Sequence, residues 1–240
     1  MLDLIKPNWP APQNIKAFMT TRLGGYSQPP FDSLNLALGS GDAEEDVQTN
    51  RALLKESLDL PQSPLWLKQV HGNKIICADV TPKSLEADAV FAKLANKICV
   101  ITTADCLPIL ITNTTGSIVC AVHAGWRSLA QGIIENAVNI CKQENQPLLV
   151  WYGAAIGLNH YEVSEEFFQT FVRLDQKFAH AFIPQTNNKY LANLKQIATL
   201  QFQALGVDQI YDSGFDTYED NKRFYSFRRD HTTGRFASLI

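Results

Sequence analysis

Cysteine and histidine are both scarce in this chain of 240 residues, which holds five of each. The cysteines are Cys77, Cys99, Cys106, Cys120 and Cys141. Their odd number and wide spacing exclude the disulfide framework that small secreted proteins use. We therefore expect free thiols in a reducing compartment. A chain of this length can bury a full hydrophobic core and needs no covalent cross-links for stability.

Long apolar segments and an excess of one charge are also lacking. No uninterrupted apolar run approaches the roughly 20 residues that a membrane-spanning helix needs. The opening segment, MLDLIKPNWPAPQNIK, holds no apolar stretch like that of an export signal. The net charge is −3, so no overall basic field favours nucleic acid as a partner. These features predict a cytoplasmic protein that binds neither a membrane nor nucleic acid.

The sequence also lacks internal repeats, low-complexity tracts and linker-like segments, so we expect a single domain over residues 1–240. Short runs rich in Ile, Val and Leu predict strands, and they read FMTT, PLWLKQV, NKIICA, NKICVIT, PILIT, SIVCAV and PLLVWYG. Apolar residues at helical spacing predict helices at 41–60, at 128–143 with Ser128 as N-cap, from Ser164 onwards, and at 191–205. The predicted fold is mixed α/β (α+β), a compact central β core covered by helices.

Three potential metal ligands stand where predicted strands end. His71 follows LWLKQV, Cys106 comes shortly after CVIT, and His123 follows SIVCAV. Functional side chains often gather at such positions, because loops there are held by a rigid scaffold. One Cys and two His suit zinc, and three protein ligands leave the fourth tetrahedral position open, as in catalytic sites. The ligands are too far apart in sequence for a compact zinc finger, so tertiary folding must assemble any such site.

Residue chemistry leaves other interpretations open. Cys106 could act as a nucleophile with His123 as its base. Cysteine is also among the most frequently buried residues, and Cys99, Cys120 and Cys141 lie in patterns typical of core residues. Sequence spacing alone does not distinguish a metal site, a thiol–imidazole pair and ordinary buried side chains.

Several motifs together resemble one family. The segments KQVHG (68–72), TADCLP (103–108) and HAGWR (123–127) are similar to signature segments of the YfiH-type family. That family was first labelled polyphenol oxidase or laccase, and is now described as purine nucleoside phosphorylase with adenosine deaminase activity. Matching segments continue in order along nearly the whole chain, including TTRLGGYS, PPFDSLNLALGSGD, AAIGLNHYEV, KYLANL and RFYSFRRDHTTGRFASLI. Two positions depart from the family pattern: Ala154 replaces Pro, and Asp216 replaces a frequent Cys.

The resemblance implies a fold related to cysteine-hydrolase-like domains and a zinc ion held by His71, Cys106 and His123, which are then also the catalytic residues. It implies phosphorolysis of adenosine, inosine, guanosine and methylthioadenosine to the base and ribose 1-phosphate, with adenosine deamination by zinc-activated water. Purine nucleosides and phosphate are the expected ligands, and a monomer or weak homodimer is the expected state. A copper oxidase fits poorly, because multicopper sites need many His ligands.

Two other functions remain as alternatives. Some relatives suggest an amidase that edits peptidoglycan precursors, with Cys106 as its nucleophile. The chain could also be a non-catalytic binding module that a metal stabilises.

Substrate-binding residues are harder to choose. Arg22, beside Gly24 and Gly25, is the first candidate for binding phosphate or ribose. Asn35 and Arg127 are further candidates, although a scaffold role for Asn35 and a solvated Arg127 are equally compatible with the sequence. The arginines of residues 221–235 rank below Arg22, because alternating arginines on a strand usually form a solvated face. We interpret the remaining histidines, His160, His180 and His231, as structural or surface residues.

Overall fold

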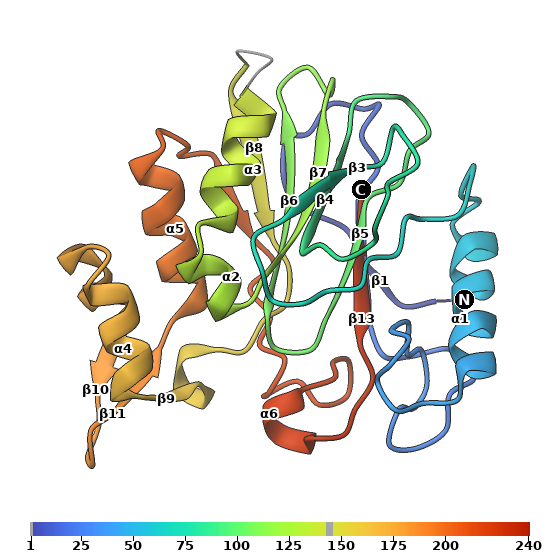
Figure 1. Cartoon of the computed structure of the whole chain (residues 1–240). Coiled ribbons are helices and arrows are strands. Elements are labelled where there is room, and N and C mark those ends of the chain that lie inside the picture. The colour runs from blue at the N-terminus through green and yellow to red at the C-terminus, as the bar shows by residue number, and fades with distance from the viewer. Residues whose placement is uncertain (1, 143–145) are drawn as a thin grey trace.

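The structure is a computed structural model that describes residues 2–142 and 146–240, and its strands form three sheets (Figure 1). The six-stranded sheet has the order β12 (Ile210–Asp212), β8 (Leu148–Tyr152), β6 (Leu107–Asn113), β7 (Val119–Ala124), β4 (Ala89–Ala92) and β3 (Ile75–Cys77). The four-stranded sheet has the order β1 (Leu4–Ile5), β2 (Phe18–Thr20), β13 (Phe236–Leu239) and β5 (Val100–Thr103). The smallest sheet joins β10 (Phe182–Pro184), β11 (Lys189–Ala192) and β9 (Glu162–Ser164).

The antiparallel pair β6 and β7 lies at the centre of the six-stranded sheet. Their register runs from Leu107 opposite Ala124 to Thr112 opposite Val119. Every residue of β6 is buried, because successive side chains enter two different cores. Ile109 packs toward the helices, whereas Leu110 packs toward the four-stranded sheet. A strand buried on both faces is therefore mostly apolar, and the two polar residues at its end, Thr112 and Asn113, hydrogen-bond to the Ile118 carbonyl and the Ser117 hydroxyl.

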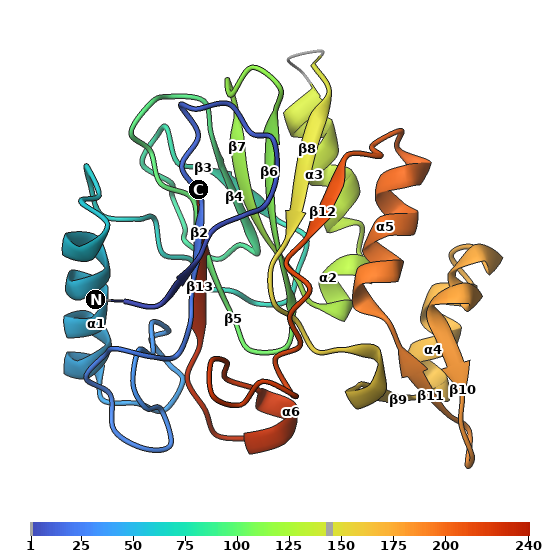
Figure 2. The same ribbon diagram turned by 180° about the vertical axis from the view of Figure 1, so that it is seen from behind.

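Helices cover the outer faces of the two larger sheets. The helices α2 (Trp126–Ala130), α3 (Ile133–Cys141) and α5 (Leu194–Ala204) lie on one side, and α1 (Glu44–Ser57) lies beyond the four-stranded sheet (Figures 1 and 2). Beside α5, α4 (Glu165–Val172) packs with the smallest sheet and the 3₁₀ turn Gln176–Ala181, and the 3₁₀ turn Leu158–His160 packs against β11. A short helix, α6 (Phe227–Asp230), precedes the final strand.

The mixed α/β fold with a central β core and surrounding helices is confirmed. The predicted helices at 41–60 and 191–205 correspond to α1 and α5, and Ser164 caps α4 by accepting a hydrogen bond from the amide of Phe167. The strand at 18–21 corresponds to β2. These elements were predictable because each keeps its own apolar periodicity and capping residue.

Three local predictions are wrong. The run PLWLKQV forms isolated bridges rather than a strand. The helix predicted at 128–143 is interrupted at Gly132, whose φ is 82°, and Ser128 is buried inside α2 instead of capping it. Residue 143 lies outside the described residues. Arg228 and Arg229 lie in α6, not on an alternating strand, because Ser226 caps a helical turn there.

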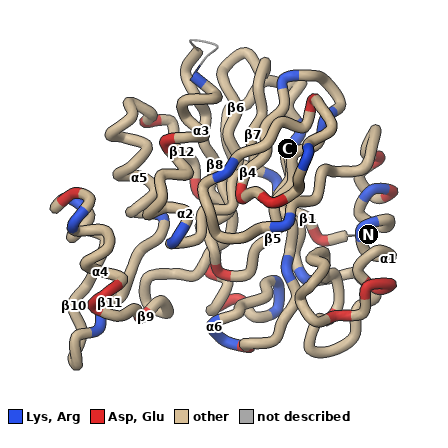
Figure 3. The backbone as a smooth tube through the Cα atoms, in the orientation of Figure 1, with Lys and Arg blue, Asp and Glu red and all other residues tan. Residues whose placement is uncertain are grey.

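The surface carries both signs of charge. Figure 3 shows acidic and basic residues interspersed over the elements, with basic residues along α6. Within the two described stretches, no helix combines the length and the apolar character that crossing a bilayer requires.

Candidate metal centre

Three side chains from different parts of the sequence meet beside the six-stranded sheet. The potential donor atoms of His71, Cys106 and His123 all lie within 4.8 Å of one another. The Sγ of Cys106 is 4.0 Å from Nε2 of His71, and the two imidazole rings meet edge to face with centroids 4.8 Å apart. Across residues 2–142 and 146–240, this is the one cluster of three or more His, Cys, Asp or Glu arranged to hold an ion.

The three clustered residues become more exposed with distance from the sheet. His123 is in β7 and is buried, Cys106 occupies the turn between β5 and β6 and is half-buried, and His71 is exposed in the loop before β3. The cluster therefore has a rigid inner side formed by the sheet and an open outer side. A ligand can approach it from the side of His71.

Asp88 connects two of the clustered residues. This carboxylate is fully buried just before β4, and its Oδ1 is 2.8 Å from Nδ1 of His123. The same oxygen accepts a hydrogen bond from the amide of His71 (2.8 Å), and Oδ2 accepts from the amides of Gly72 (2.6 Å) and Val70 (3.2 Å). One side chain thus orients the His123 ring through Nδ1, leaving Nε2 available to a metal, and fixes the loop that carries His71.

The loop before His71 has a second anchor. Gln69 donates from Nε2 to the carbonyl oxygen of Thr102 and accepts the Thr102 amide at Oε1, both at 2.8 Å. These side-chain bonds attach the KQVHG segment to β5 in place of a strand ladder. They hold His71 with a positive φ of 60°, a conformation that non-glycine residues adopt only at some cost.

Asp105 fixes the turn that carries Cys106. Its φ is 85°, and its carboxylate accepts hydrogen bonds from the Thr217 hydroxyl and the Arg228 amide, both at 2.6 Å. The carbonyl oxygen of Asp105 accepts the amide of Ile156 at 3.0 Å. The C-terminal segment therefore holds the residue directly before Cys106, and both carboxylate oxygens of Asp105 already have donors.

The electrostatics of the cluster favour a thiolate beside an imidazolium. Burial alone would raise the pKa of Cys106, but the charge and hydrogen bonds of His123 and His71 outweigh it and lower that pKa. Burial opposes protonation of His123, whereas the charge of Cys106 and the hydrogen bond to Asp88 raise its pKa. A thiolate is the form in which cysteine binds metals or attacks carbon.

The donor set fits a zinc ion. Tetrahedral zinc places sulfur and nitrogen donors roughly 3.5 Å from one another, which agrees with a cluster whose donor atoms lie within 4.8 Å. One thiolate and two imidazoles are preferred zinc ligands, and three protein ligands leave one position for water or substrate. A multicopper centre would need more imidazoles than these two.

Gly125 leaves room for the cluster. A Cβ at this position would lie 3.1 Å from Cδ2 of His71 and 3.2 Å from Sγ of Cys106. We expect Gly125→Ala to weaken zinc binding roughly tenfold, because both ligands would have to move and their fixed geometry sets the affinity. Competition with a chromophoric chelator measures this affinity. Gly72→Ala is the matched control, since its Cβ would meet nothing closer than 3.5 Å, and equal affinities in the two variants would contradict the expectation.

Comparison with known proteins places the chain in a family. The family model for multi-copper polyphenol oxidoreductase laccase matches residues 16–240. A purine nucleoside phosphorylase from Haemophilus influenzae is 44% identical over 100% of this chain and 99% of its own. Purine nucleoside phosphorylase YfiH from Escherichia coli is 42% identical with the same coverage. The chain belongs to the YfiH-type purine nucleoside phosphorylase family.

Solved structures of YfiH-type proteins share this fold. A Neisseria meningitidis protein is 35% identical, with a TM-score of 0.93 over 98% of this chain and 97% of the other. YlmD from Geobacillus stearothermophilus is 30% identical, with a TM-score of 0.88 over 99% of this chain and 95% of its own. The fold is therefore that of the family over almost the whole chain.

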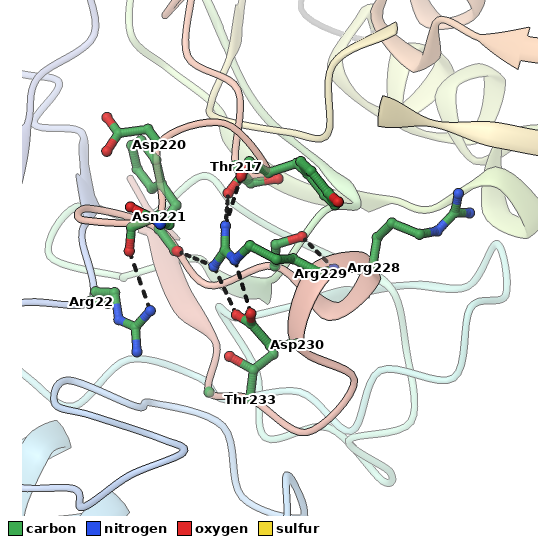
Figure 4. A network of polar contacts seen from close by, with 12 residues as sticks. Arg22, Thr217, Asp220, Asn221, Arg228, Arg229, Asp230 and Thr233 are labelled. Carbon is green, nitrogen blue, oxygen red and sulfur yellow. Dashed lines mark hydrogen bonds and ion pairs between the residues drawn. The ribbon is translucent and has the colours of Figure 1, made fainter. Parts of the chain in front are cut away.

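Arg22, the first substrate candidate in this YfiH-type chain, has its guanidinium bound by protein groups. Nε donates to the carbonyl oxygen of Asp32 (2.8 Å), Nη2 pairs with the Asp32 carboxylate (3.1 Å), and Nη1 donates to the carbonyl oxygen of Asn221 (3.3 Å; Figure 4). The group also lies 4.8 Å from the centre of the Tyr225 ring. A role in binding phosphate or ribose stays a prediction.

Asn35 and Arg127 have very different environments. Asn35 is fully buried, with its amide nitrogen bound to Ser40 and Asp42 and its oxygen accepting the amides of Ala37 and Arg235. Arg127 is exposed in α2, with its guanidinium 4.4 Å from the ring of Trp126. The substrate roles of both residues stay predictions.

The two departures from the YfiH-type pattern lie close to the scaffold of the site. Ala154 is fully buried two residues after the end of β8. Asp216 accepts a hydrogen bond from Nδ1 of His160 at 2.9 Å, and the His160 ring stacks on Tyr218 with centroids 4.5 Å apart. His160 thus has a structural partner in Asp216, the residue that replaces the frequent Cys.

Sequence reasoning missed Asp88 and Gln69. Gln69 lies within KQVHG, but only His71 of that segment was interpreted as a functional residue. Asp88 gave one signal: it is an acidic residue between apolar residues at the start of a buried strand, in ADAV (87–90). A buried carboxylate requires partners, so this position could have been recognised as part of a site.

Proposed function

We propose that the protein is a zinc-dependent purine nucleoside enzyme. It cleaves adenosine, inosine, guanosine and methylthioadenosine with phosphate, and it also deaminates adenosine. The observation that carries the proposal is the cluster of His71, Cys106 and His123 with donor atoms within 4.8 Å. The names of full-length relatives, which are purine nucleoside phosphorylases, support the substrate class.

In this proposal the three clustered residues hold the zinc ion. Bound zinc acts as a Lewis acid and lowers the pKa of water in its open position toward about 7. Asp88 keeps a proton on Nδ1 of His123, so the ring presents Nε2 to the ion. The thiolate of Cys106 supplies negative charge without a proton to release. These residues therefore prepare the site before substrate arrives.

Phosphorolysis exchanges one bond to the ribose for another. An oxygen of hydrogen phosphate forms a bond to C1′, and the bond between C1′ and the purine nitrogen breaks with its electron pair on the base. The proton of hydrogen phosphate ends on the purine, so base and ribose 1-phosphate leave as the balanced products. The protein must hold phosphate beside the sugar and exclude water that would compete for C1′.

Deamination uses water in place of phosphate. The oxygen of water forms a bond to C6 of adenosine, and the bond from C6 to its amino group breaks. One proton of water passes to the departing amino group, which leaves as ammonia, and the other ends on N1 of the purine. The reaction follows the logic of zinc nucleobase deaminases. It requires no phosphate, which distinguishes it experimentally from phosphorolysis.

Zinc-loaded protein mixed with inosine and phosphate should release hypoxanthine and ribose 1-phosphate in equal amounts. The same protein mixed with adenosine alone should release ammonia and inosine. Liquid chromatography follows the purines, and a coupled assay follows ammonia. Omission of phosphate should stop the first reaction and leave the second unchanged. Absence of both products from zinc-replete protein would eliminate the proposed activity.

A second candidate is the amidase that edits peptidoglycan precursors. The lowered pKa of Cys106 beside His123 favours it, because that pair resembles an activated thiol nucleophile. A covalent adduct trapped at Cys106 in protein that is stripped of metal and still active would support the amidase. Loss of all activity on chelation, restored by zinc, would support the nucleoside enzyme.

The remaining expectations continue as proposals: a single domain over residues 1–240, a cytoplasmic location, and a monomer or weak homodimer. A single cooperative unfolding transition would support one domain. Light scattering over a range of protein concentrations would determine the state of association.

A further inference from the structure

Arg228 and Arg229 are neighbours in α6, yet their guanidinium groups have opposite surroundings (Figure 4). All five N–H donors of Arg229 bind protein oxygens, namely the carbonyls of Thr217 (2.9 Å), Tyr218 (2.9 Å) and Phe224 (3.0 Å) and the carboxylate of Asp230 (2.9 and 2.8 Å). Arg229 therefore clamps the loop before α6 and has no donor left for a ligand.

Arg228 leaves most of its donors free. Figure 4 shows its side chain pointing away from the network around Arg229. Its Nη1 donates to the carbonyl oxygen of Glu162 at 2.8 Å, and in the described part of the chain no acceptor binds its Nε or Nη2 and no carboxylate pairs with it. A half-buried guanidinium with free N–H groups is suited to bind an anion.

The backbone of Arg228 is attached to the metal centre. Its amide donates to the carboxylate of Asp105 at 2.6 Å, and Asp105 directly precedes Cys106. The guanidinium carbon lies 4.9 Å from the centre of the Tyr161 ring. The cationic group is thus held over Tyr161, next to the turn that supplies the thiolate ligand.

Tyr161 offers a second donor at the same place. Burial raises the pKa of its phenol, and the charge of Cys106 adds to this while that of Arg228 opposes it. The hydroxyl is therefore a neutral O–H donor near neutral pH. It hydrogen-bonds to no group within residues 2–142 and 146–240 that the structure describes, so it is available to a ligand.

A second guanidinium lies near this position. Arg235 lies within electrostatic reach of Cys106 and Asp105, and its guanidinium donates to the carbonyl oxygens of Thr233 and Gly234 rather than to a carboxylate. Two acidic residues lie nearby: the Asp105 carboxylate accepts hydrogen bonds from Thr217 and the Arg228 amide, and Glu162 accepts from Arg228 through its backbone carbonyl. Two guanidinium groups that pair with no carboxylate in the described part of the chain favour an incoming anion.

We propose that Arg228, together with the Tyr161 hydroxyl, forms the phosphate subsite beside the metal centre. The proposal rests on the proposed function and names where that function takes its co-substrate. A guanidinium can bind two phosphate oxygens side by side, which fixes orientation as well as affinity. Arg228 is thereby preferred over Arg22, whose guanidinium nitrogens are already bound by Asp32 and Asn221.

Titration calorimetry with inorganic phosphate tests the subsite without turnover. We expect Arg228→Gln to raise the Kd for phosphate at least about tenfold, and Tyr161→Phe to raise it about threefold, because each removes donors to the anion. Arg228→Lys, which keeps the charge but loses the planar fork, should fall between wild type and Arg228→Gln. Arg173→Gln is the control, because it makes the same charge change at an exposed residue after α4.

Steady-state kinetics supplies a readout that a merely structural role would not change. For Arg228→Gln the KM for phosphate should rise with the Kd, while the KM for inosine, the zinc content and the circular dichroism spectrum stay near wild type. Adenosine deamination, which consumes no phosphate, should also be retained.

The outcomes separate the subsite from the function. An unchanged phosphate Kd in Arg228→Gln, or no phosphate binding by wild type, overturns the subsite. Phosphate binding that depends on Arg228 in a wild-type protein that forms no ribose 1-phosphate supports the anion site and rejects the proposed function. Equal loss of inosine and phosphate affinity in Arg228→Gln would indicate general disruption and overturn the proposal.

Discussion

Protein with Cys106 replaced by alanine should retain less than about a tenth of the wild-type zinc and lose nucleoside turnover, because two imidazoles alone hold zinc weakly. The substitution removes the thiolate that faces His71 at 4.0 Å and that interacts electrostatically with His123. Mass spectrometry of the metal content, performed beside the inosine assay, measures both effects on one preparation.

Cys77→Ala is the matched control for this substitution. Cys77 is a half-buried thiol in β3 and takes no part in the cluster. Its replacement should leave zinc content and turnover near wild type. A Cys106→Ala protein with full zinc occupancy would show that Cys106 is not a ligand. If that protein were also inactive, the thiol would serve turnover in another role, which a covalent adduct trapped at Cys106 would identify as that of a nucleophile.

Asp88→Asn should weaken zinc binding by about 10- to 100-fold, the usual consequence of removing a carboxylate behind a metal-binding histidine. Asparagine has nearly the same shape, but its NH₂ group cannot accept the hydrogen bonds that the lost oxygen accepted. It would face either the amides of Gly72 and Val70 or the donors on His71 and His123. Zinc affinity by chelator competition and thermal unfolding of metal-free protein both report the change.

Asp79→Asn is the control for this second substitution. The carboxylate of Asp79 also accepts backbone amides, those of Lys93 and Leu94, but it lies outside the cluster. It should lower the thermal stability without changing zinc affinity. If the Asp88 and Asp79 variants bound zinc equally well, the assigned role of Asp88 would be wrong.

The set His71, Cys106 and His123 was predictable through the family resemblance of KQVHG, TADCLP and HAGWR, because residue chemistry alone also allowed a thiol–imidazole pair or ordinary buried side chains. The hydrogen bonds that position these three residues were not predictable. Asp88 contacts two segments distant from it in the chain, and only the packed sheet brings them together. A carboxylate acquires such a role from its surroundings, which residue type does not encode.

Arg228 and Arg229 also show that residue type does not reveal the surroundings of a side chain. They are adjacent and identical in type, so no periodicity or motif separates a clamp from a free cation. The difference arises because the loop at 217–224 presents its carbonyl oxygens to Arg229 and not to Arg228. The helix break at Gly132 was also not predictable from periodicity, because the apolar pattern of the sequence continues across it.

The position of β13 has a consequence for biosynthesis. This strand lies inside the four-stranded sheet, between β2 and β5, and the nearby Thr217 and Arg228 secure the turn that carries Cys106. While the ribosome is still making residues 217–239, the earlier strands lack both the middle of their sheet and the partners of Asp105. If the cluster binds a metal as proposed, we expect it to do so only after translation, because the turn that carries Cys106 is not secured in a nascent chain that ends before residue 217.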